Sequence, residues 1–96
     1  MKRILLSLVL TLMCSIALPA KDLKATADSL YAARQYQKAS QLYEQLLDKG
    51  DNANVYYNLG NAYYRMHDIA HAILNYERAA NREPGDSDIR FNLTLA

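Results

Sequence analysis

One stretch, residues 53–86, constrains the fold more than any other part of the sequence. Apolar and small residues recur there twice at the three- and four-residue spacing of a helix face, on either side of a polar break at His67 and Asp68. Pro84 and Gly85 end the second run, because proline lacks a backbone N–H and glycine is a poor helix former. The stretch therefore predicts two helices joined by a tight turn. The two faces consist of Tyr56, Leu59, Gly60, Tyr63 and Met66, and of Ile69, Ala72, Ile73, Tyr76, Ala79 and Ala80.

Small residues on these faces, Gly60, Ala72 and Ala79, allow the two helices to pack closely and antiparallel. The spaced set as a whole resembles the tetratricopeptide repeat, a helix-turn-helix unit of about 34 residues that stacks into solenoids. The residues that carry the resemblance are Tyr56, in place of the usual tryptophan, and Leu59, Gly60, Tyr63, Ala72, Tyr76, Ala79 and Pro84. One residue departs from the pattern, since His67 stands in the turn where the family usually has glycine.

A related pattern precedes this stretch, and the beginning of another follows it. When the chain is aligned with itself, Tyr31 matches Tyr64, Ala39 matches Ala72, and Tyr43 matches Tyr76 at one constant offset. Residues 21–52 are therefore predicted to form a divergent first repeat, and residues 53–86 the second. After Pro84-Gly85, Asp86 and Ser87 can cap a helix over residues 87–96, which is either a capping helix or the first helix of a truncated third repeat. The predicted fold is an all-α solenoid of two repeats plus one further helix.

Residues 1–20 are of a different kind. Lys2 and Arg3 precede a mostly apolar run over residues 4–18, with small residues at Ala17 and Ala20. This arrangement is typical of a secretory signal peptide, and the run is shorter than the about 20 residues that a membrane-spanning helix needs. We expect cleavage near Ala17 or Ala20 and an exported, periplasmic protein, with a retained membrane anchor as the alternative.

The remaining chain has almost balanced charge. Without Lys2 and Arg3 it carries nine basic and ten acidic side chains, and the single cysteine, Cys14, lies in the predicted signal peptide. No internal disulfide can form, and no basic excess is available to follow a phosphate backbone. The composition therefore argues against nucleic-acid binding. It also offers no second apolar run for a membrane, so a membrane contact is expected only through the signal segment or a missing C-terminal region.

Catalysis and metal binding find little support among the residues. Beyond the predicted signal peptide there is no cysteine nucleophile and no glycine-rich phosphate loop, and the two histidines, His67 and His71, lie within one turn. Their four-residue spacing can suit a metal on one helix face, but two nitrogen ligands without a third make a weak site. We expect no enzyme activity, no cofactor and no metal, with the histidines as a solvated pair.

Four of the eight tyrosines fit the helix faces. Tyr43, Tyr56, Tyr63 and Tyr76 occupy positions on the packing faces, so we expect their rings in the core and their hydroxyls at the surface. Tyr57 and Tyr64 lie beside the packing face.

The family resemblance implies a binding groove, because the first helix of each tetratricopeptide repeat lines a concave surface that takes extended peptides or partner helices. Carried onto this sequence, the predicted groove residues are Lys24, Tyr31, Asn54, Tyr57, Asn58, Asn61, Tyr64, Arg65, Phe91 and Asn92, together with Lys21, Asp28 and Asp88. Asparagine amides can pair with both groups of a peptide backbone, aromatic rings offer rigid apolar area, and a guanidinium can bind a carboxylate. The alternative is that these are ordinary exposed helix residues.

Some members of the family grip a C-terminal carboxylate with a clamp of lysine, asparagine and arginine side chains. Lys24 and Asn58 fall at matching positions, but Asp28, Asp88 and Asn92 stand at the others. Two acids there would repel a carboxylate, so we predict no such clamp.

A closer resemblance concerns the runs YYNLGNAYYR, AILNYERAA and PGDSDIRFNLTLA, which are similar to the tetratricopeptide protein of the aerotolerance operon in the Bacteroides group. In that family, exported repeats are followed by a membrane span and an SH3-like domain, so the resemblance implies a partial copy. The sequence as a whole predicts an exported module for protein–protein interaction, an adaptor or assembly scaffold that binds a protein or peptide partner. The alternative is a structural spacer or oligomerisation fragment of a longer membrane-bound protein.

Overall fold

The computed structural model describes residues 20–96, so the predicted signal peptide lies outside the described residues except for Ala20. Five helices make up this part of the chain: α2 (Ala20–Ala32), α3 (Tyr36–Leu47), α4 (Ala53–Arg65), α5 (Ile69–Arg82) and α6 (Ser87–Leu95). No strand occurs within the described range. The predicted all-α, repeat-like fold is confirmed. None of these five helices is both long and apolar enough to cross a membrane.

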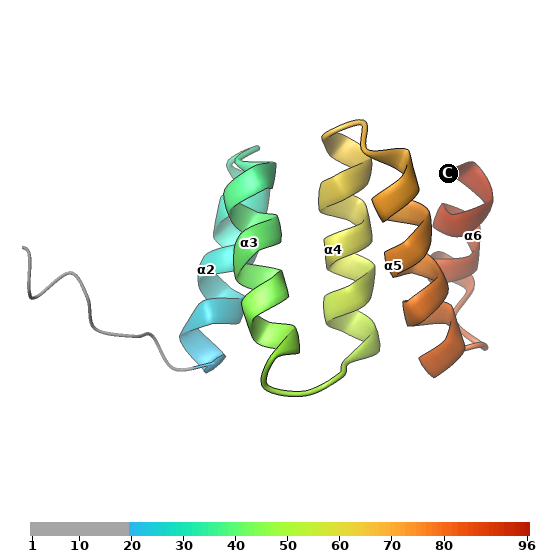
Figure 1. Ribbon diagram of the computed structural model, residues 1–96, viewed down its shortest axis with the longest axis horizontal. Coiled ribbons are helices and arrows are strands. Elements are labelled where there is room, and N and C mark those ends of the chain that lie inside the picture. The colour runs from blue at the N-terminus through green and yellow to red at the C-terminus, as the bar shows by residue number, and fades with distance from the viewer. Residues whose placement is uncertain (1–19) are drawn as a thin grey trace, which may run out of the picture.

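The helices form a row along the molecule and alternate in direction, with α2 set behind α3 in this view (Figure 1), so that residues of α2 and α4 line one hollow. Helices α2 and α3 form a first pair, and α4 and α5 a second pair, against which α6 packs. The short turns within the pairs, residues 33–35 and 66–68, share one edge of the row, which we call the turn edge. The longer loops after each pair, residues 48–52 and 83–86, share the opposite edge, the loop edge. The row therefore has two edges with different connections.

Side chains at the helix starts explain where three of the helices begin. Asn52 accepts hydrogen bonds from the backbone N–H groups of Asn54 and Val55, at 2.8 and 3.3 Å. Asp86 accepts two in the same way at the start of α6, and Asp68 accepts one at the start of α5. Each such cap contributes about 1 kcal/mol to helix stability. The predicted cap at Asp86 is confirmed.

The two short turns have the same backbone geometry. Arg34 and His67, which hold equivalent positions in the two turns, both have a φ of 63°. The residues after them close the preceding helices, since the N–H of Gln35 donates to Leu30 and that of Asp68 donates to Tyr63. A residue other than glycine costs roughly 1 kcal/mol in this left-handed region. His67 therefore fits the turn in place of the family's glycine, but with some backbone strain.

The core contains six of the predicted face residues of α4 and α5 and also two that the predicted faces leave out, Val55 and Ala62. The six are Tyr56, Leu59, Gly60, Ala72, Tyr76 and Ala79. One cluster joins the first pair to α4 and consists of Leu23, Ala27, Ala39, Tyr43, Leu46, Val55 and Leu59; a second consists of Tyr56, Ala79 and Ile89. A Cβ placed on Gly60 would lie 2.6 Å from two ring carbons of Tyr76, so the tyrosine ring fills the space that the glycine leaves. Ile69 differs from the prediction: it is 38% exposed, because it opens α5 beside a hollow at the turn edge instead of under α4.

Candidate partner-binding groove

Two adjoining hollows run along the side of the molecule where α2, α4 and α6 meet. We call them together the groove. The first, of about 370 Å³, is lined by Lys24, Asp28, Tyr31, Tyr43, Asn54, Asn58 and Asn61. The second, of about 340 Å³, is lined by Tyr31, Asn61, Tyr64, Arg65, Tyr76, Asn92 and Leu95. Because Tyr31 and Asn61 belong to both linings, the two hollows form one continuous surface.

Most of the predicted groove residues come together on this surface, and two do not. Lys24, Tyr31, Asn54, Asn58, Asn61, Tyr64, Arg65 and Asn92 line the groove. Tyr57 lines a different hollow at the loop edge, and Phe91 is 63% exposed on α6 and lines neither part of the groove. Of the further candidates, Asp28 lies in the groove and Asp88 outside it.

A polar network holds three helices together at the floor of the second hollow. The hydroxyl of Tyr76 on α5 donates to Oδ1 of Asn61 on α4, at 2.5 Å. The Nδ2 group of Asn92 on α6 donates to the same Oδ1 and to the hydroxyl of Tyr57, at 3.0 Å each. Burial raises the pKa of Tyr76 well above its usual value, so this hydroxyl stays protonated and remains a donor.

A charged version of this contact occurs at the floor of the first hollow. The hydroxyl of Tyr43 donates to Oδ1 of Asp28 at 2.6 Å, and Nζ of Lys24 pairs with Oδ2 at 2.9 Å. Burial works to raise the pKa of Asp28, but the hydrogen bonds from Tyr43 and Lys24 outweigh it and lower the pKa. Burial and the bond to Asp28 raise the pKa of Tyr43. Lys24 is thus engaged by a neighbouring acid, which adds to the reasons against a carboxylate clamp.

The wall of the groove keeps hydrogen-bonding groups available. Asn58 donates from Nδ2 to Oδ1 of Asn54 at 3.1 Å, and within residues 20–96 its own Oδ1 and the Nδ2 of Asn54 have no hydrogen bond. Arg65 is exposed, and its interaction with the Tyr31 hydroxyl raises the pKa of the guanidinium, which stays charged. The groove can therefore offer an amide donor, an amide acceptor and a cation to a bound chain.

The hydroxyls of Tyr43 and Tyr76 are groove features that the sequence analysis did not single out. Both rings are buried, at 2% exposed, and both hydroxyls reach the floor of the groove. The sequence contains a repeated spacing that could have identified them. Each tyrosine bonds a residue 15 positions earlier, and the pairs Asp28–Tyr43 and Asn61–Tyr76 hold equivalent places in the two predicted repeats.

The two histidines have separate surroundings. His71 bonds Asp68 through Nδ1 at 2.8 Å, and its ring stacks on that of Tyr63 with 5.0 Å between the centroids. His67 stays exposed in the turn. The bonds from the His71 side chain and backbone lower the pKa of Asp68. Among the described residues, no three His, Cys, Asp or Glu side chains come close enough together to hold a metal ion.

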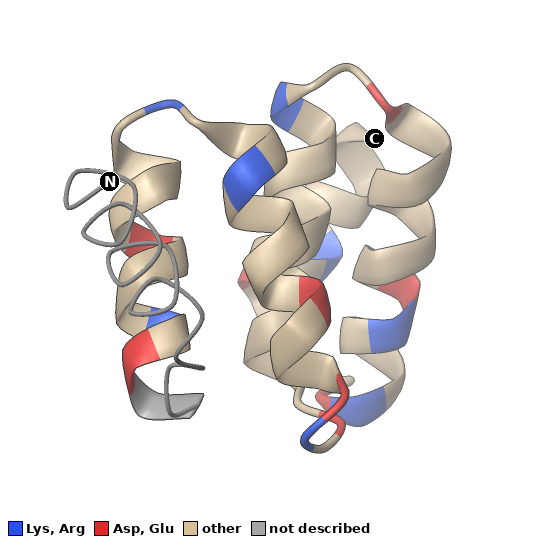
Figure 2. Cartoon of the chain, turned by 60° about the vertical axis from the view of Figure 1, so that its left-hand side comes forward, with Lys and Arg blue, Asp and Glu red and all other residues tan. Residues whose placement is uncertain are grey.

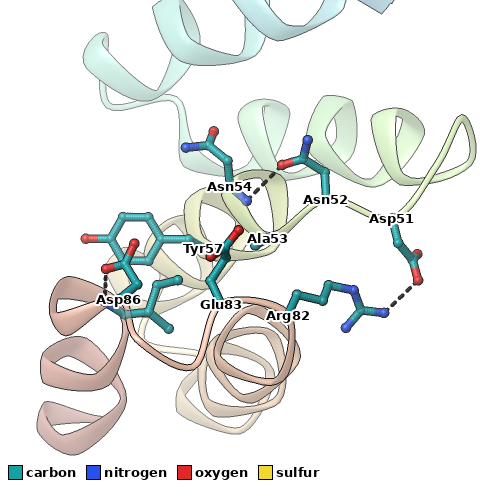
Figure 3. A pocket seen from close by; sticks show the side chains of 9 residues that line it. Asp51, Asn52, Ala53, Asn54, Tyr57, Arg82, Glu83 and Asp86 are labelled. Atoms are coloured by element: carbon teal, nitrogen blue, oxygen red, sulfur yellow. Dashed lines mark hydrogen bonds and ion pairs between the residues drawn. The ribbon is translucent and has the colours of Figure 1, made fainter.

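A third hollow, at the loop edge, lies over contacts that tie the second helix pair to the loop between the pairs (Figure 3). Arg82 at the end of α5 pairs with Asp51 in the preceding loop at 2.6 Å, and its guanidinium lies 4.6 Å from the ring centre of Tyr56. The Tyr56 hydroxyl donates to the other oxygen of Asp51 at 3.1 Å. The hydrogen bond from Arg82, followed by that from Tyr56, lowers the pKa of Asp51. These groups satisfy one another, which indicates a structural role.

Comparison with known families gives a match to the tetratricopeptide repeat over residues 53–86. The matched segment contains α4, the turn, α5 and the loop after it. Comparison with curated proteins finds no similar sequence. Residues 53–86 therefore form a tetratricopeptide repeat, which suggests a module for protein–protein interaction.

Proposed function

We propose that this protein is an exported adaptor or assembly scaffold that binds a protein or peptide partner in its groove and carries out no reaction of its own. The observation that carries the proposal is the groove itself. Eight side chains chosen from the sequence line one continuous surface, and part of their hydrogen-bonding capacity is unused within residues 20–96.

An extended peptide is the partner that suits these groups best. A peptide backbone presents alternating N–H and C=O groups, which the Oδ1 of Asn58 and the Nδ2 of Asn54 can match. Tyr31 is held edge-on against Tyr36, with ring centroids 5.2 Å apart, so it offers a pre-positioned ring to a partner side chain. A surface that is already ordered loses less conformational entropy on binding.

The groove test compares a variant with alanine substitutions inside the groove and a control variant with alanine substitutions outside it. The first replaces Asn54, Asn58 and Tyr64 by alanine, which removes groove side chains without touching the buried network of Asn61. The control replaces Leu74 and Asn81 by alanine, because both are exposed on α5 and neither lines the groove. We expect pull-down of the partner to fall by about tenfold or more with the first variant and to stay unchanged with the control. Equal capture by both would remove the groove from the proposal.

Export is supported by the sequence of residues 1–20, with its basic, apolar and small-residue regions. Expression in a Gram-negative host followed by mass spectrometry of the periplasmic fraction would test it. We expect a mature chain that begins after Ala17 or Ala20. Recovery of the intact chain, Met1 included, from the cytoplasm alone would contradict export.

A second candidate function is favoured by the surface of α6. Phe91 and Leu95 are 63% and 59% exposed there, and their four-residue spacing places them on one face of the helix. They suit a spacer or oligomerisation unit of a longer membrane-bound protein of the aerotolerance type. In sedimentation measurements an oligomerisation unit predicts self-association of the wild type, which Phe91→Ser with Leu95→Ser abolishes. A reading frame that continues past Ala96 into an apolar span would favour it further.

A further inference from the structure

A separate hollow of about 550 Å³ lies at the turn edge, next to the groove. Its lining consists of Arg34, Tyr36, Tyr64, Arg65, His67 and Ile69. Tyr64 and Arg65 also line the groove, so the two surfaces meet at the end of α4. We call it the turn-edge hollow. A chain bound in the groove can continue into it without leaving the protein surface.

The charges at this hollow are of one sign. Two arginines line it, and none of the carboxylates between residues 20 and 96 does. Asp68, the acid of the neighbouring turn, is held by the side chain and backbone of His71. Neither Arg34 nor Arg65 forms an ion pair within residues 20–96, whereas Arg82 at the loop edge is paired with Asp51. In Figure 2, blue segments stand next to both turns, with one red segment, Asp68, on the second turn, and the loops at the opposite edge carry red as well as blue.

The backbone conformation of the two turns also suggests a role for the side chains at this hollow. Arg34 and His67 occupy equivalent positions with a φ of 63°, where glycine would fit without strain. Both are exposed and both line the turn-edge hollow, with ring nitrogens or a guanidinium that can donate hydrogen bonds. Strained residues that persist at repeated positions are a reason to look for a role of their side chains.

We propose that the turn-edge hollow binds the carboxylate groups of an acidic segment of the protein partner, where that segment leaves the groove past Arg65. Guanidinium groups bind carboxylates in a planar, bidentate manner, and the two arginines, which form no ion pair within residues 20–96, can hold neighbouring acids. Tyr36, Tyr64 and Ile69 add apolar walls for the side chains between the acids. The inference rests on the proposed function, because it describes the chemistry of the same partner.

The probe is a fluorescein-labelled peptide, short enough to span the hollow, in which glutamate alternates with phenylalanine, and its match has glutamine in place of every glutamate. Fluorescence anisotropy measures binding of both peptides to the full chain at low and high salt. The test variant is Arg34→Gln with Arg65→Gln. The control variant is Lys49→Gln with Arg90→Gln, because both residues are exposed and outside the hollow, and their loss changes the net charge equally. Circular dichroism verifies that each variant is folded.

We expect the glutamate peptide to bind about tenfold more tightly than the glutamine peptide, and more weakly at high salt. The test variant should lose about tenfold in affinity and the control less than about twofold. Equal binding of the two peptides, or equal losses in the two variants, would overturn the proposal. So would saturable binding of inorganic phosphate with no binding of the glutamate peptide, because the hollow would then belong to a phosphate-bearing ligand. The groove is tested separately by Asn54→Ala with Asn58→Ala, because these two residues line the groove and not the hollow, so either inference can fail without the other.

Discussion

The two helix pairs place a buried tyrosine at equivalent positions but use different hydrogen-bond acceptors for its hydroxyl. In each pair a buried tyrosine on the second helix donates to a residue of the first helix, 15 positions earlier. In the first pair the acceptor is the carboxylate of Asp28, which is half-exposed and also binds Lys24. In the second pair it is the neutral amide of Asn61, which α6 partly covers through Asn92. A covered carboxylate would be costly, so the position within the row decides which acceptor is tolerated.

The largest effect on stability is expected at Gly60, which packs under Tyr76 in the second pair. The equivalent residue in the first pair is Ala27. Gly60→Ala would place a methyl group 2.6 Å from ring carbons of Tyr76, and the hydroxyl bond to Asn61 prevents the ring from swinging away. We expect a net loss of about 1 to 3 kcal/mol in urea unfolding, although alanine is the better helix former.

The matched control is Ala27→Gly in the first pair. Ala27 is fully buried, so removal of its methyl group should cost about 1 kcal/mol through helix propensity and lost packing. If Gly60→Ala were instead stabilising, the two pairs would tolerate the same residue, and the contact between Gly60 and Tyr76 would not set the spacing of α4 and α5.

The next effect concerns the tyrosine hydroxyls. Tyr43→Phe removes a hydrogen bond to a charged group and is expected to cost about 2 kcal/mol. Tyr76→Phe removes a bond to a neutral amide that keeps its second donor, Asn92, and is expected to cost about 1 kcal/mol. Urea unfolding of both variants at neutral pH measures the order. The reverse order would mean that the shared amide is the stronger of the two acceptors.

Features of the fold and the groove can be predicted from the sequence where neighbouring residues along the chain determine them. The helix start at Asp86 and the stop at Pro84 follow from neighbouring residues, and the sequence predicts both. Helical periodicity identified the apolar faces, but it cannot say which polar face becomes concave; the groove residues came from the family resemblance. The bonds of Asn61 join three helices, and the exposure of Ile69 depends on where α4 ends. Neither can be read from spacing along one helix.

A smaller effect on stability is expected at low pH, because only the first pair has a hydrogen-bond acceptor that can be protonated there, the carboxylate of Asp28. The pKa of Asp28 is lowered in the folded protein, so its contribution to stability is complete above about pH 4, the unfolded value, and is lost as the pH falls through the folded value. Asp28→Asn lacks this contribution, so its stability should decline less than that of the wild type between about pH 4 and pH 2. Urea unfolding across this range measures the difference. Parallel curves would show that Asp28 is not linked to folding.

The smallest effect concerns the two turns, where the pairs are most alike. Glycine removes the strain at a φ of 63°, but it also gains freedom in the unfolded chain, so Arg34→Gly should stabilise by only about 0.5 kcal/mol. His67→Gly should gain less, since histidine adopts this backbone region more readily than arginine. Thermal unfolding measures both, with Arg34→Ala as the control that keeps the strain.

A loss of stability in either glycine variant would mean that the side chain makes contacts that outweigh the strain. If instead Arg34→Gly stabilises the fold and also weakens binding of the acidic peptide, the two measurements separate the effect of Arg34 on folding from its effect on binding. The arginine would then be unfavourable for the folded chain alone and favourable only when a carboxylate is bound, which is the behaviour expected of a residue retained for recognition.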